Sequence, residues 1–485
     1  MGLKQKTITG FIWTSAGTVG NGLVSFLVTI ILARILLPYD FAIIELLVIF
    51  VSVSNVIVDS GFSQAIIRDD NPTEEDLSSV FYFNIALSFT LYILLFFAAP
   101  YISDYFEAPE LTVLSRVVFL VIIFNSFSII QNATLSRNLN FAAVNKSSVI
   151  GSFLSGGISL IMAFTGFGIW ALVANMVLLP FFRSVFLWYQ SNWRPTKMFS
   201  FLSIKKYFAF GGFLMLQGII DTIVTNITSF IIGKVYSKNE LGFYSQGGKL
   251  NGYIVNPLSL IISKVTYPIL SKVKNDEGRL KEIYSKVMGL IVFVILPLSI
   301  FLCINSENTI VFLFGEKWRP AAIYLSLFAV FGMFNPLQHV CRNIIMVKGK
   351  TKTLFYFAFV KQAVRLITII LAIPMGVLAI ASANIITSVI ASMFYIFLGM
   401  YYLNYSVKEF LKDIYKTIIS GILLAISIFV SFYILNDLNI YLTVSIQIII
   451  MLLVYLGSSI FFHNVYINEI SKILVPLVKK VIIKK

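Results

Sequence analysis

The sequence predicts an all-α membrane protein that crosses the bilayer about fourteen times. Of its 485 residues, 58% are hydrophobic and only 12% are charged, and the mean hydropathy is +0.90. Soluble domains are about half apolar and about one quarter charged, and one soluble core cannot bury this much apolar surface. The composition therefore excludes the soluble, disordered and disulfide-stabilised classes.

Fourteen apolar segments follow one another along the chain, each near the length of about 20 residues that a spanning helix needs. Barrel strands would be half as long and would alternate in polarity, so the spans are expected to be helices. The first segment follows Lys4 and Lys6 and is too long for the core of a signal peptide. Tight turns are expected at Phe167-Gly168 and Met375-Gly376. We expect spans at 11–37, 39–66, 79–100, 111–134, 147–166, 168–190, 207–233, 247–270, 283–305, 320–346, 354–374, 376–403, 412–433 and 440–463.

The basic residues predict the orientation of these spans. The formal net charge is +15, which in a soluble protein would suggest nucleic-acid binding. In a membrane protein, Lys and Arg gather in cytoplasmic loops. With the N-terminus inside, 25 of the 37 Lys and Arg residues fall in internal segments, 4 in external loops and 8 within spans. We therefore expect both termini to be cytoplasmic and no nucleic-acid partner.

A similarity between two stretches 200 residues apart suggests an internal duplication. Thr29–Arg34 resembles Ser229–Lys234, and Asp40–Ile44 resembles Glu240–Tyr244; chance similarity between apolar sequences is the alternative. Two parallel six-helix repeats around a central cavity are typical of alternating-access transporters. The expected domains are an N-terminal lobe (1–206), a C-terminal lobe (207–403), two additional spans (404–463) and a basic amphipathic tail on the inner leaflet (464–485).

Motifs for catalysis or metal binding are weak. Gly349-Lys350-Thr351 resembles the end of a phosphate-binding loop, but Ile344 occupies the position of the required first glycine. His339 and His463 lack metal-ligand spacing, both cysteines lie in apolar segments, and the external acidic residues are scattered over short loops. We expect no catalytic residues, no metal and no cofactor.

Basic residues inside spans are the main candidates for substrate binding, because a charge at mid-helix costs about 2.5–3.5 kcal/mol on insertion scales and usually faces a cavity or a partner. Arg365 lies about 12 residues into its span, roughly 18 Å deep, and Lys361 is one turn earlier on the same face. These two cations predict an anionic substrate; a buried counter-charge is the alternative. The remaining candidates are Arg34, Lys249, Lys264 and Arg342, of which Arg34, Lys249 and Arg342 lie near span ends and could reach the interface instead.

Two acidic residues within spans are candidate counter-charges or ion-coupling sites. Asp221 lies in the middle of its span on a polar face with Gln217 and Thr225, and Asp59 lies deep in the second span. Asp221 could neutralise Arg365 or bind a coupling proton or cation.

With these features the sequence resembles the polysaccharide-export flippases of the multidrug/oligosaccharidyl-lipid/polysaccharide exporter superfamily, in particular the capsule, colanic-acid and teichuronic-acid type. The resemblance covers nearly the whole chain and depends on the order and spacing of short motifs. They include Leu32-Ala33-Arg34, Asp59-Ser60-Gly61-Phe62, Thr73–Leu77, Arg137–Phe141, Gly166–Leu172, Trp193-Arg194-Pro195, Leu241–Ser245, Tyr267-Pro268 and Gly315–Ala321.

The resemblance implies a transporter of the bacterial cytoplasmic membrane that moves a polyprenyl-diphosphate-linked oligosaccharide to the outer leaflet, for surface polysaccharides such as capsule, O-antigen or lipopolysaccharide. It implies membrane lipids and other glycan-assembly enzymes, such as a polymerase, as partners. Three alternatives remain open: a multidrug/cation antiporter of the same superfamily, a membrane polymerase or ligase of the glycan pathway, and a non-transporting scaffold.

Overall fold

The computed structural model describes residues 3–435, 438–467 and 469, with side chains at all of these except 3–13, 261, 263–265, 268 and 351. Every regular element in this part of the chain is a helix, and two compact units form, Met1–Ser245 and Gln246–Lys485. Thirteen helical segments within the described residues are long and apolar enough to span a membrane. The predicted class, an all-α membrane protein with about fourteen spans, is confirmed.

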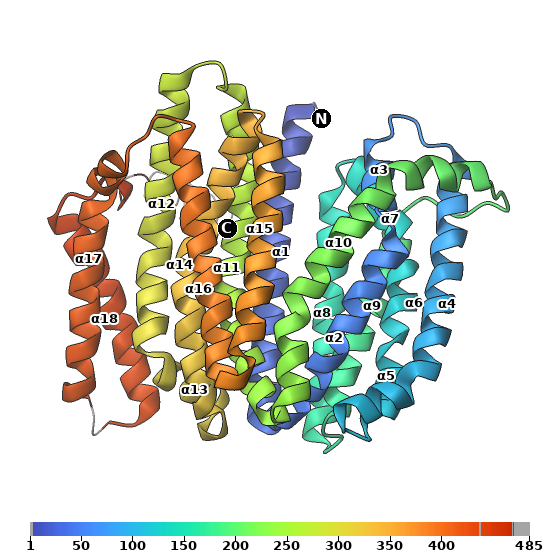
Figure 1. The fold of residues 1–485 in the computed structure, drawn as a ribbon, viewed down its shortest axis with the longest axis horizontal. Helices are drawn as coiled ribbons and strands as arrows, with labels where there is room; N and C mark the ends of the chain where they lie inside the picture. Colours follow the sequence, from blue (N-terminus) through green and yellow to red (C-terminus); the bar gives the residue numbers. More distant parts are fainter. Residues whose placement is uncertain (1–2, 436–437, 468, 470–485) are drawn as a thin grey trace, which may run out of the picture. The chain divides into compact units, whose positions relative to one another are not determined.

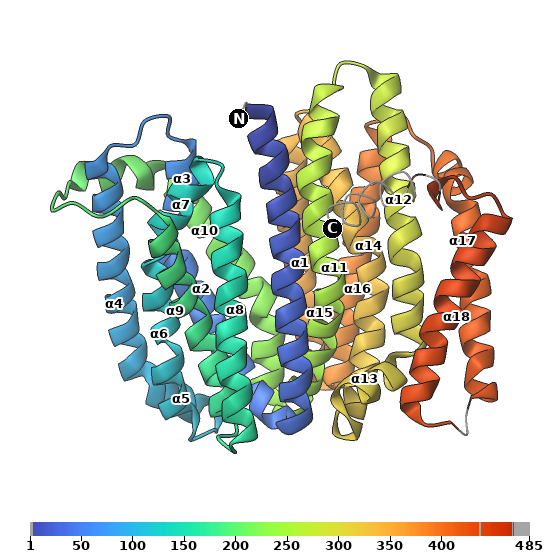
Figure 2. The same cartoon turned by 180° about the vertical axis from the view of Figure 1, so that it is seen from behind.

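The N-terminal unit begins with long helices joined by tight turns, and its middle spans pack side by side (Figures 1 and 2). Its helices are α1 (Leu3–Ile35), α2 (Pro38–Asp59), α3 (Phe62–Arg68), α4 (Glu74–Phe106), α5 (Leu111–Val118), α6 (Leu120–Ser126), α7 (Ile129–Arg137), α8 (Phe141–Phe164), α9 (Trp170–Gln190), α10 (Phe201–Val235) and the first turns of α11 (Lys238–Lys272).

The span expected at 111–134 consists of three short helices, α5, α6 and α7, instead of one. Serine side chains in this segment bind nearby backbone carbonyls: the hydroxyl of Ser126 donates to Ile123, and that of Ser128 donates to Asn125. Such local hydrogen bonds compete with the regular helix pattern, here at the boundary between α6 and α7. Together the three helices still cover Leu111–Arg137, a single membrane-crossing path.

The C-terminal unit contains the remaining spans, and α17 and α18 form a hairpin that packs on α12 (Figure 1). Its elements after α11 are α12 (Glu277–Ile304), α13 (Ser306–Phe314), η1 (Glu316–Ala321), α14 (Ala322–Val347), α15 (Thr351–Ala372), η2 (Ile373–Met375), α16 (Val377–Tyr401), α17 (Val407–Ile434) and α18 (Ile440–Phe461). Most of the expected basic tail lies outside the described residues.

The turns expected between adjoining spans are present, and glycines make them possible. Gly166 and Gly168 have φ of +84° and +55° between α8 and α9, and Gly376 has φ of +99° between η2 and α16. These left-handed conformations are accessible to glycine at little cost. The expected span at 247–270 lies within α11, which begins nine residues earlier.

The two stretches aligned at an offset of 200 have the same local structure. α1 ends at Ile35 and α2 begins at Pro38, while α10 ends at Val235 and α11 begins at Lys238. The N-terminal ends of α2 and α11 also meet within the N-terminal unit, where a Cβ on Gly242 would lie 2.2 Å from the carbonyl oxygen of Pro38. The duplication of the whole six-helix repeat, and the domain boundaries derived from it, stay predictions.

Candidate functional site: a basic cluster in the C-terminal unit

A cluster of basic side chains lies on α14 and α15. His339 and Arg342 are three residues apart on α14, and both Arg342 and Lys361 of α15 act electrostatically on His339. Residues three apart on a helix are surface neighbours. The charges of Arg342 and Lys361, on two different helices, are therefore close enough to influence His339.

An aromatic ring lies beneath Arg342, and further rings pack against it. The Arg342 guanidinium is 5.9 Å from the ring centroid of Tyr395, a buried residue of α16. Phe357 meets the Tyr395 ring edge-on at 4.5 Å and stacks on Phe394 at 4.4 Å. Phe357 is also one helical turn before Lys361, so α15 places a ring and an ammonium on the same side. A cation over an aromatic face is attracted by the ring quadrupole.

The predicted pair Lys361 and Arg365 lies on α15, one turn apart, and both side chains are half-buried. Arg365 is fourteen residues after the start of this helix, about 21 Å at 1.5 Å per residue. Sequence reasoning placed Arg342 with the residues that could reach the interface from a span end. Arg342 is exposed and five residues before the end of α14, and its charge and that of Lys361 both act on His339.

The other predicted residues lie apart from this cluster or in the other unit. Arg34 is an exposed residue in the last turn of α1, and Asp221 is exposed on α10. Lys249 is half-buried on α11, eleven residues from the start of that helix. Lys264 is also on α11, but its side chain lies outside the described part. Pairing of Asp221 with Arg365 stays a prediction.

Asp59 has a local structural contact. It is the last residue of α2, and its carboxylate accepts hydrogen bonds from the backbone N–H of Ser63, at 3.3 Å, and from the Ser63 hydroxyl. Ser60 and Gly61, both at positive φ, form the turn between these residues. Asp59 therefore holds the start of α3, and its expected role in ion coupling stays a prediction.

Arg183 is a candidate that sequence reasoning did not single out. It is half-buried on α9, three residues after Pro180. Among the described residues its side chain makes no hydrogen bond or ion pair, and its Nε atom is buried. The sequence alone could have identified Arg183 as a candidate, because it lies near the middle of an apolar span, where an unpaired charge is costly.

A network of charged side chains holds the loop after α3 in the N-terminal unit. Lys206 of α10 lies 2.8 Å from Asp69 and 2.9 Å from Asp76, and the Tyr207 hydroxyl donates to Asp69 at 2.8 Å. The hydrogen bonds from Lys206 and Tyr207 lower the pKa of Asp69 to about 2. The guanidinium of Arg137 donates to the backbone carbonyls of Asp69 and Asp70. This network attaches the loop after α3 to α7 and α10.

The fold is that of a known class of helical exporters. The chain matches the inward closed conformation of the lipid II flippase MurJ with a TM-score of 0.77, covering 94% of this chain and 99% of that one at 17% identity. An inward-facing multidrug resistance transporter of the MATE family, MOP superfamily, matches with a TM-score of 0.60 over 81% of this chain and 94% of that one at 13% identity. This protein is therefore a multi-pass membrane protein with the fold of MOP-superfamily transporters.

Relatives found by sequence are involved in bacterial surface glycans. The teichuronic acid biosynthesis protein TuaB of Bacillus subtilis (strain 168) is 25% identical, covering 73% of this chain and 74% of its own. The lipopolysaccharide biosynthesis protein WzxC of Escherichia coli (strain K12) is 24% identical, covering 74% and 73%. The model of the family described as "Polysaccharide biosynthesis protein" matches residues 31–323, and the chain belongs to this family. The matched region includes Arg34 and ends before α15.

Proposed function

We propose that this protein is a flippase that moves a polyprenyl-diphosphate-linked oligosaccharide from the cytoplasmic to the outer leaflet of the bacterial inner membrane. The observation that carries the proposal is the basic cluster of Arg342 and Lys361, in which the Arg342 guanidinium is 5.9 Å from the Tyr395 ring centroid, in a chain of the polysaccharide biosynthesis family. Basic residues and aromatic rings together fit a substrate that joins a diphosphate to sugars.

The diphosphate determines which side chains the site needs. Arg342 presents a planar fork of N–H donors that matches two phosphate oxygens, whereas Lys361 supplies a compact positive charge. The rings of Tyr395 and Phe357 offer flat apolar surface beside these donors. A multidrug/cation antiporter would need acidic groups for a cationic substrate, and the charged groups of this cluster are basic.

We propose transport without catalysis. Two lobes that open alternately to each side would carry the polar headgroup across while the lipid tail stays in the bilayer. The distribution of 25 internal against 4 external basic residues supports cytoplasmic termini. Association with a glycan polymerase or other assembly enzymes stays a prediction.

The test uses cells that lack this protein but keep the enzymes that build the lipid-linked glycan. Intact cells are treated with a label that cannot cross the membrane, and polyprenyl-diphosphate oligosaccharides are then extracted. We expect complete units to accumulate without the label. Accumulation of labelled units on the outer face would instead indicate a polymerase or ligase, and normal surface glycan with no accumulation would favour the antiporter.

Complementation with variants then tests the site. We expect Arg342→Gln and Lys361→Gln proteins to leave the glycan on the inner face at normal expression. Lys352→Gln is the matched control, because Lys352 is exposed near the start of the same helix as Lys361. Full export by both cluster variants would exclude this cluster as the substrate site. Glycan assembly that requires the protein but not these side chains would favour a scaffold.

A further inference from the structure

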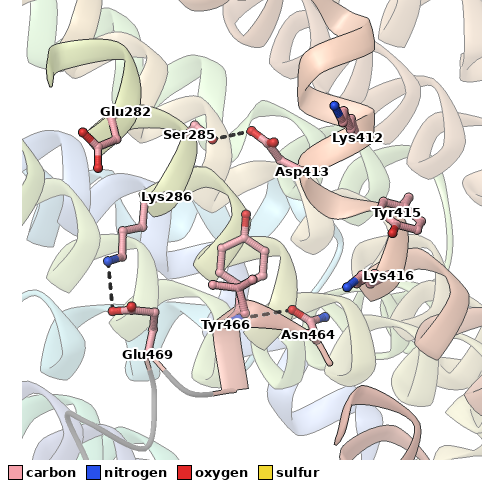
Figure 3. A pocket seen from close by; sticks show the side chains of 11 residues that line it. Glu282, Ser285, Lys286, Lys412, Asp413, Tyr415, Lys416, Asn464, Tyr466 and Glu469 are labelled. Carbon is pink, nitrogen blue, oxygen red and sulfur yellow. Dashed lines mark hydrogen bonds and ion pairs between the residues drawn. The ribbon is translucent and has the colours of Figure 1, made fainter. Parts of the chain in front are cut away.

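A pocket outside the basic cluster lies within the C-terminal unit, where α12, α17 and the residues after α18 meet (Figure 3). Its volume is about 380 Å³. Three lysines and three acidic residues line it: Lys286, Lys412, Lys416, Glu282, Asp413 and Glu469. Figure 3 shows Lys286 and Glu469 on one side of the Tyr466 ring, with Tyr415 and Lys416 on the other. So many charges around one small volume call for a polar ligand.

The pocket lies near helix ends, at the depth of lipid headgroups. Glu282 is five residues after the start of α12, and Lys412 is five residues after the start of α17. Each is therefore about 8 Å from the end of its helix. Asn464, which lines the pocket from the segment after α18, is three residues beyond the end of that helix. Helices that span a bilayer place such positions in the polar interfacial layer.

Two of the lysines lie on α17, with a single acidic residue, Asp413, between them in the chain. Lys412 and Lys416 are one turn apart, where like charges destabilise a helix. Within the described part of the chain, Lys412 makes no hydrogen bond or ion pair, and Lys416 donates only to the carbonyl of His463, at 3.3 Å. Two adjacent ammonium groups with free donors fit the oxygens of one phosphate.

The acidic residues of the pocket differ in whether they have ion-pair or hydrogen-bond partners. Glu469 forms an ion pair with Lys286 at 3.0 Å, and Asp413 accepts hydrogen bonds from the hydroxyls of Tyr405 and Ser285. Glu282, on the opposite wall from Lys412, makes neither an ion pair nor a hydrogen bond among the described residues, and it is exposed. The pocket thus has spare positive charge on α17 and a spare negative charge on α12.

The mouth of the pocket is apolar and aromatic. The Tyr415 side chain is 48% exposed and Val465 is 63% exposed, although both line the pocket. Tyrosines are enriched at the level of the headgroups. Burial and the charge of Asp413 raise the pKa of Tyr466 to about 12, so its phenol remains a neutral hydrogen-bonding group. A ligand with a polar head and an apolar tail matches both parts of this site.

We propose that this pocket binds a zwitterionic phospholipid with a primary ammonium, a phosphatidylethanolamine headgroup. Its phosphate lies between Lys412 and Lys416, and its ammonium donates to Glu282. An acidic phospholipid would satisfy the lysines but supplies no positive group to offset the charge of Glu282. A choline headgroup has no N–H donor for the carboxylate. The site is separate from the proposed substrate cluster and does not depend on the transported molecule.

The experiment measures lipids bound to the purified full-length protein by native mass spectrometry. The protein is equilibrated with equal amounts of phosphatidylethanolamine, phosphatidylglycerol and phosphatidylcholine. We expect phosphatidylethanolamine to bind about tenfold more than either competitor, the effect of one charge-assisted hydrogen bond. The double variant Lys412→Gln/Lys416→Gln should lose this bound lipid about tenfold, and Glu282→Gln should lose the preference over phosphatidylglycerol.

Lys408→Gln is the control, since Lys408 is an exposed lysine one turn before Lys412 and outside the pocket. It should bind lipid as the unaltered protein does. The preference among lipids is a ratio on the same folded protein, so partial unfolding cannot mimic its loss. The loss of bound lipid in the double variant is measured against the Lys408→Gln protein. A preference for phosphatidylglycerol, or no change in the three pocket substitutions, would overturn the proposal. Millimolar phosphoethanolamine should leave the lipid bound; displacement would assign the pocket to a soluble aminophosphate instead of a lipid.

Discussion

Gly61 and Gly211 pack backbone against backbone, so that neither position has room for a side chain. A Cβ on Gly211 would lie 2.3 Å from the carbonyl oxygen of Ser60, and one on Gly61 would lie 2.5 Å from the carbonyl oxygen of Gly211. Gly61 also has φ of +72°. This close approach holds α10 against the turn between α2 and α3 within the N-terminal unit.

Gly211→Ala should therefore destabilise the protein. The added methyl group meets backbone, which cannot move aside as a side chain can, and overpacking of this kind costs about 1–3 kcal/mol. Thermal unfolding in detergent measures the effect. Gly157→Ala on α8 is the control, because no atom lies within 4 Å of its Cβ position. Equal unfolding temperatures for the two variants would contradict the packing described.

The ion pair between Asp69 and Lys206 predicts a dependence of stability on pH. The pKa of Asp69 is lowered to about 2 from 3.8, so its contribution is present above about pH 4 and is lost as pH falls toward 2. Lys206 is 50% exposed, and solvent screening reduces the contribution to about 1 kcal/mol. Asp69→Asn should lower the free energy of unfolding at pH 7, and the difference from the unaltered protein should vanish as the pH falls below about 2.

Asp70→Asn provides the comparison for this prediction. Asp70 is next to Asp69 and contributes its backbone carbonyl instead of its carboxylate to the Arg137 contact. Its substitution should leave the pH profile unchanged. The same pH dependence in both variants would indicate a general charge effect instead of the Asp69–Lys206 pair.

The Arg342→Lys substitution tests whether the positive charge of Arg342 or the planar shape of its guanidinium matters for export. Lysine keeps the positive charge but loses the planar fork and stacks less well on the Tyr395 ring. We expect glycan export to fall about tenfold, the cost of one charge-assisted hydrogen bond. Export is measured as the amount of lipid-linked glycan that a membrane-impermeant reagent labels on intact cells. An unaffected Arg342→Lys protein would show that only the charge matters at this position.

The sequence was sufficient for the helical class and for most spans, because long apolar segments have few other ways to satisfy their backbone in lipid. It was less informative about α5, α6 and α7, because hydropathy gives no sign of the breaks and the serine hydroxyls that compete with the helix between α6 and α7 lie within an apolar segment. The span expected at 247–270 lies within a longer helix, α11. Polar positions such as Lys249 lower the hydropathy of α11, although the helix itself continues.

The candidate site was predicted less completely than the fold. Helical spacing was enough to pair Lys361 with Arg365, because both are on one helix. Grouping Arg342 with Lys361 needs the packing of α14 against α15, and the ring beneath Arg342 comes from α16. Such contacts join positions 19 and 53 residues apart along the chain, which the spacing of residues within a helix cannot reveal.

Arg183 should show opposite effects on stability and on transport. Its side chain is half-buried in α9 with no hydrogen bond or ion pair in the described part of the protein, so Arg183→Met should raise the free energy of unfolding by about 1 kcal/mol or more. If the guanidinium is kept for an anionic substrate, the same variant should export less glycan. Arg116→Met is the control, because Arg116 donates to the carbonyl of Phe96 and lies 4.4 Å from its ring centroid, contacts whose loss should destabilise the protein. Thermal unfolding and export are measured on both variants, and a destabilised Arg183→Met protein with normal export would indicate that Arg183 is structural.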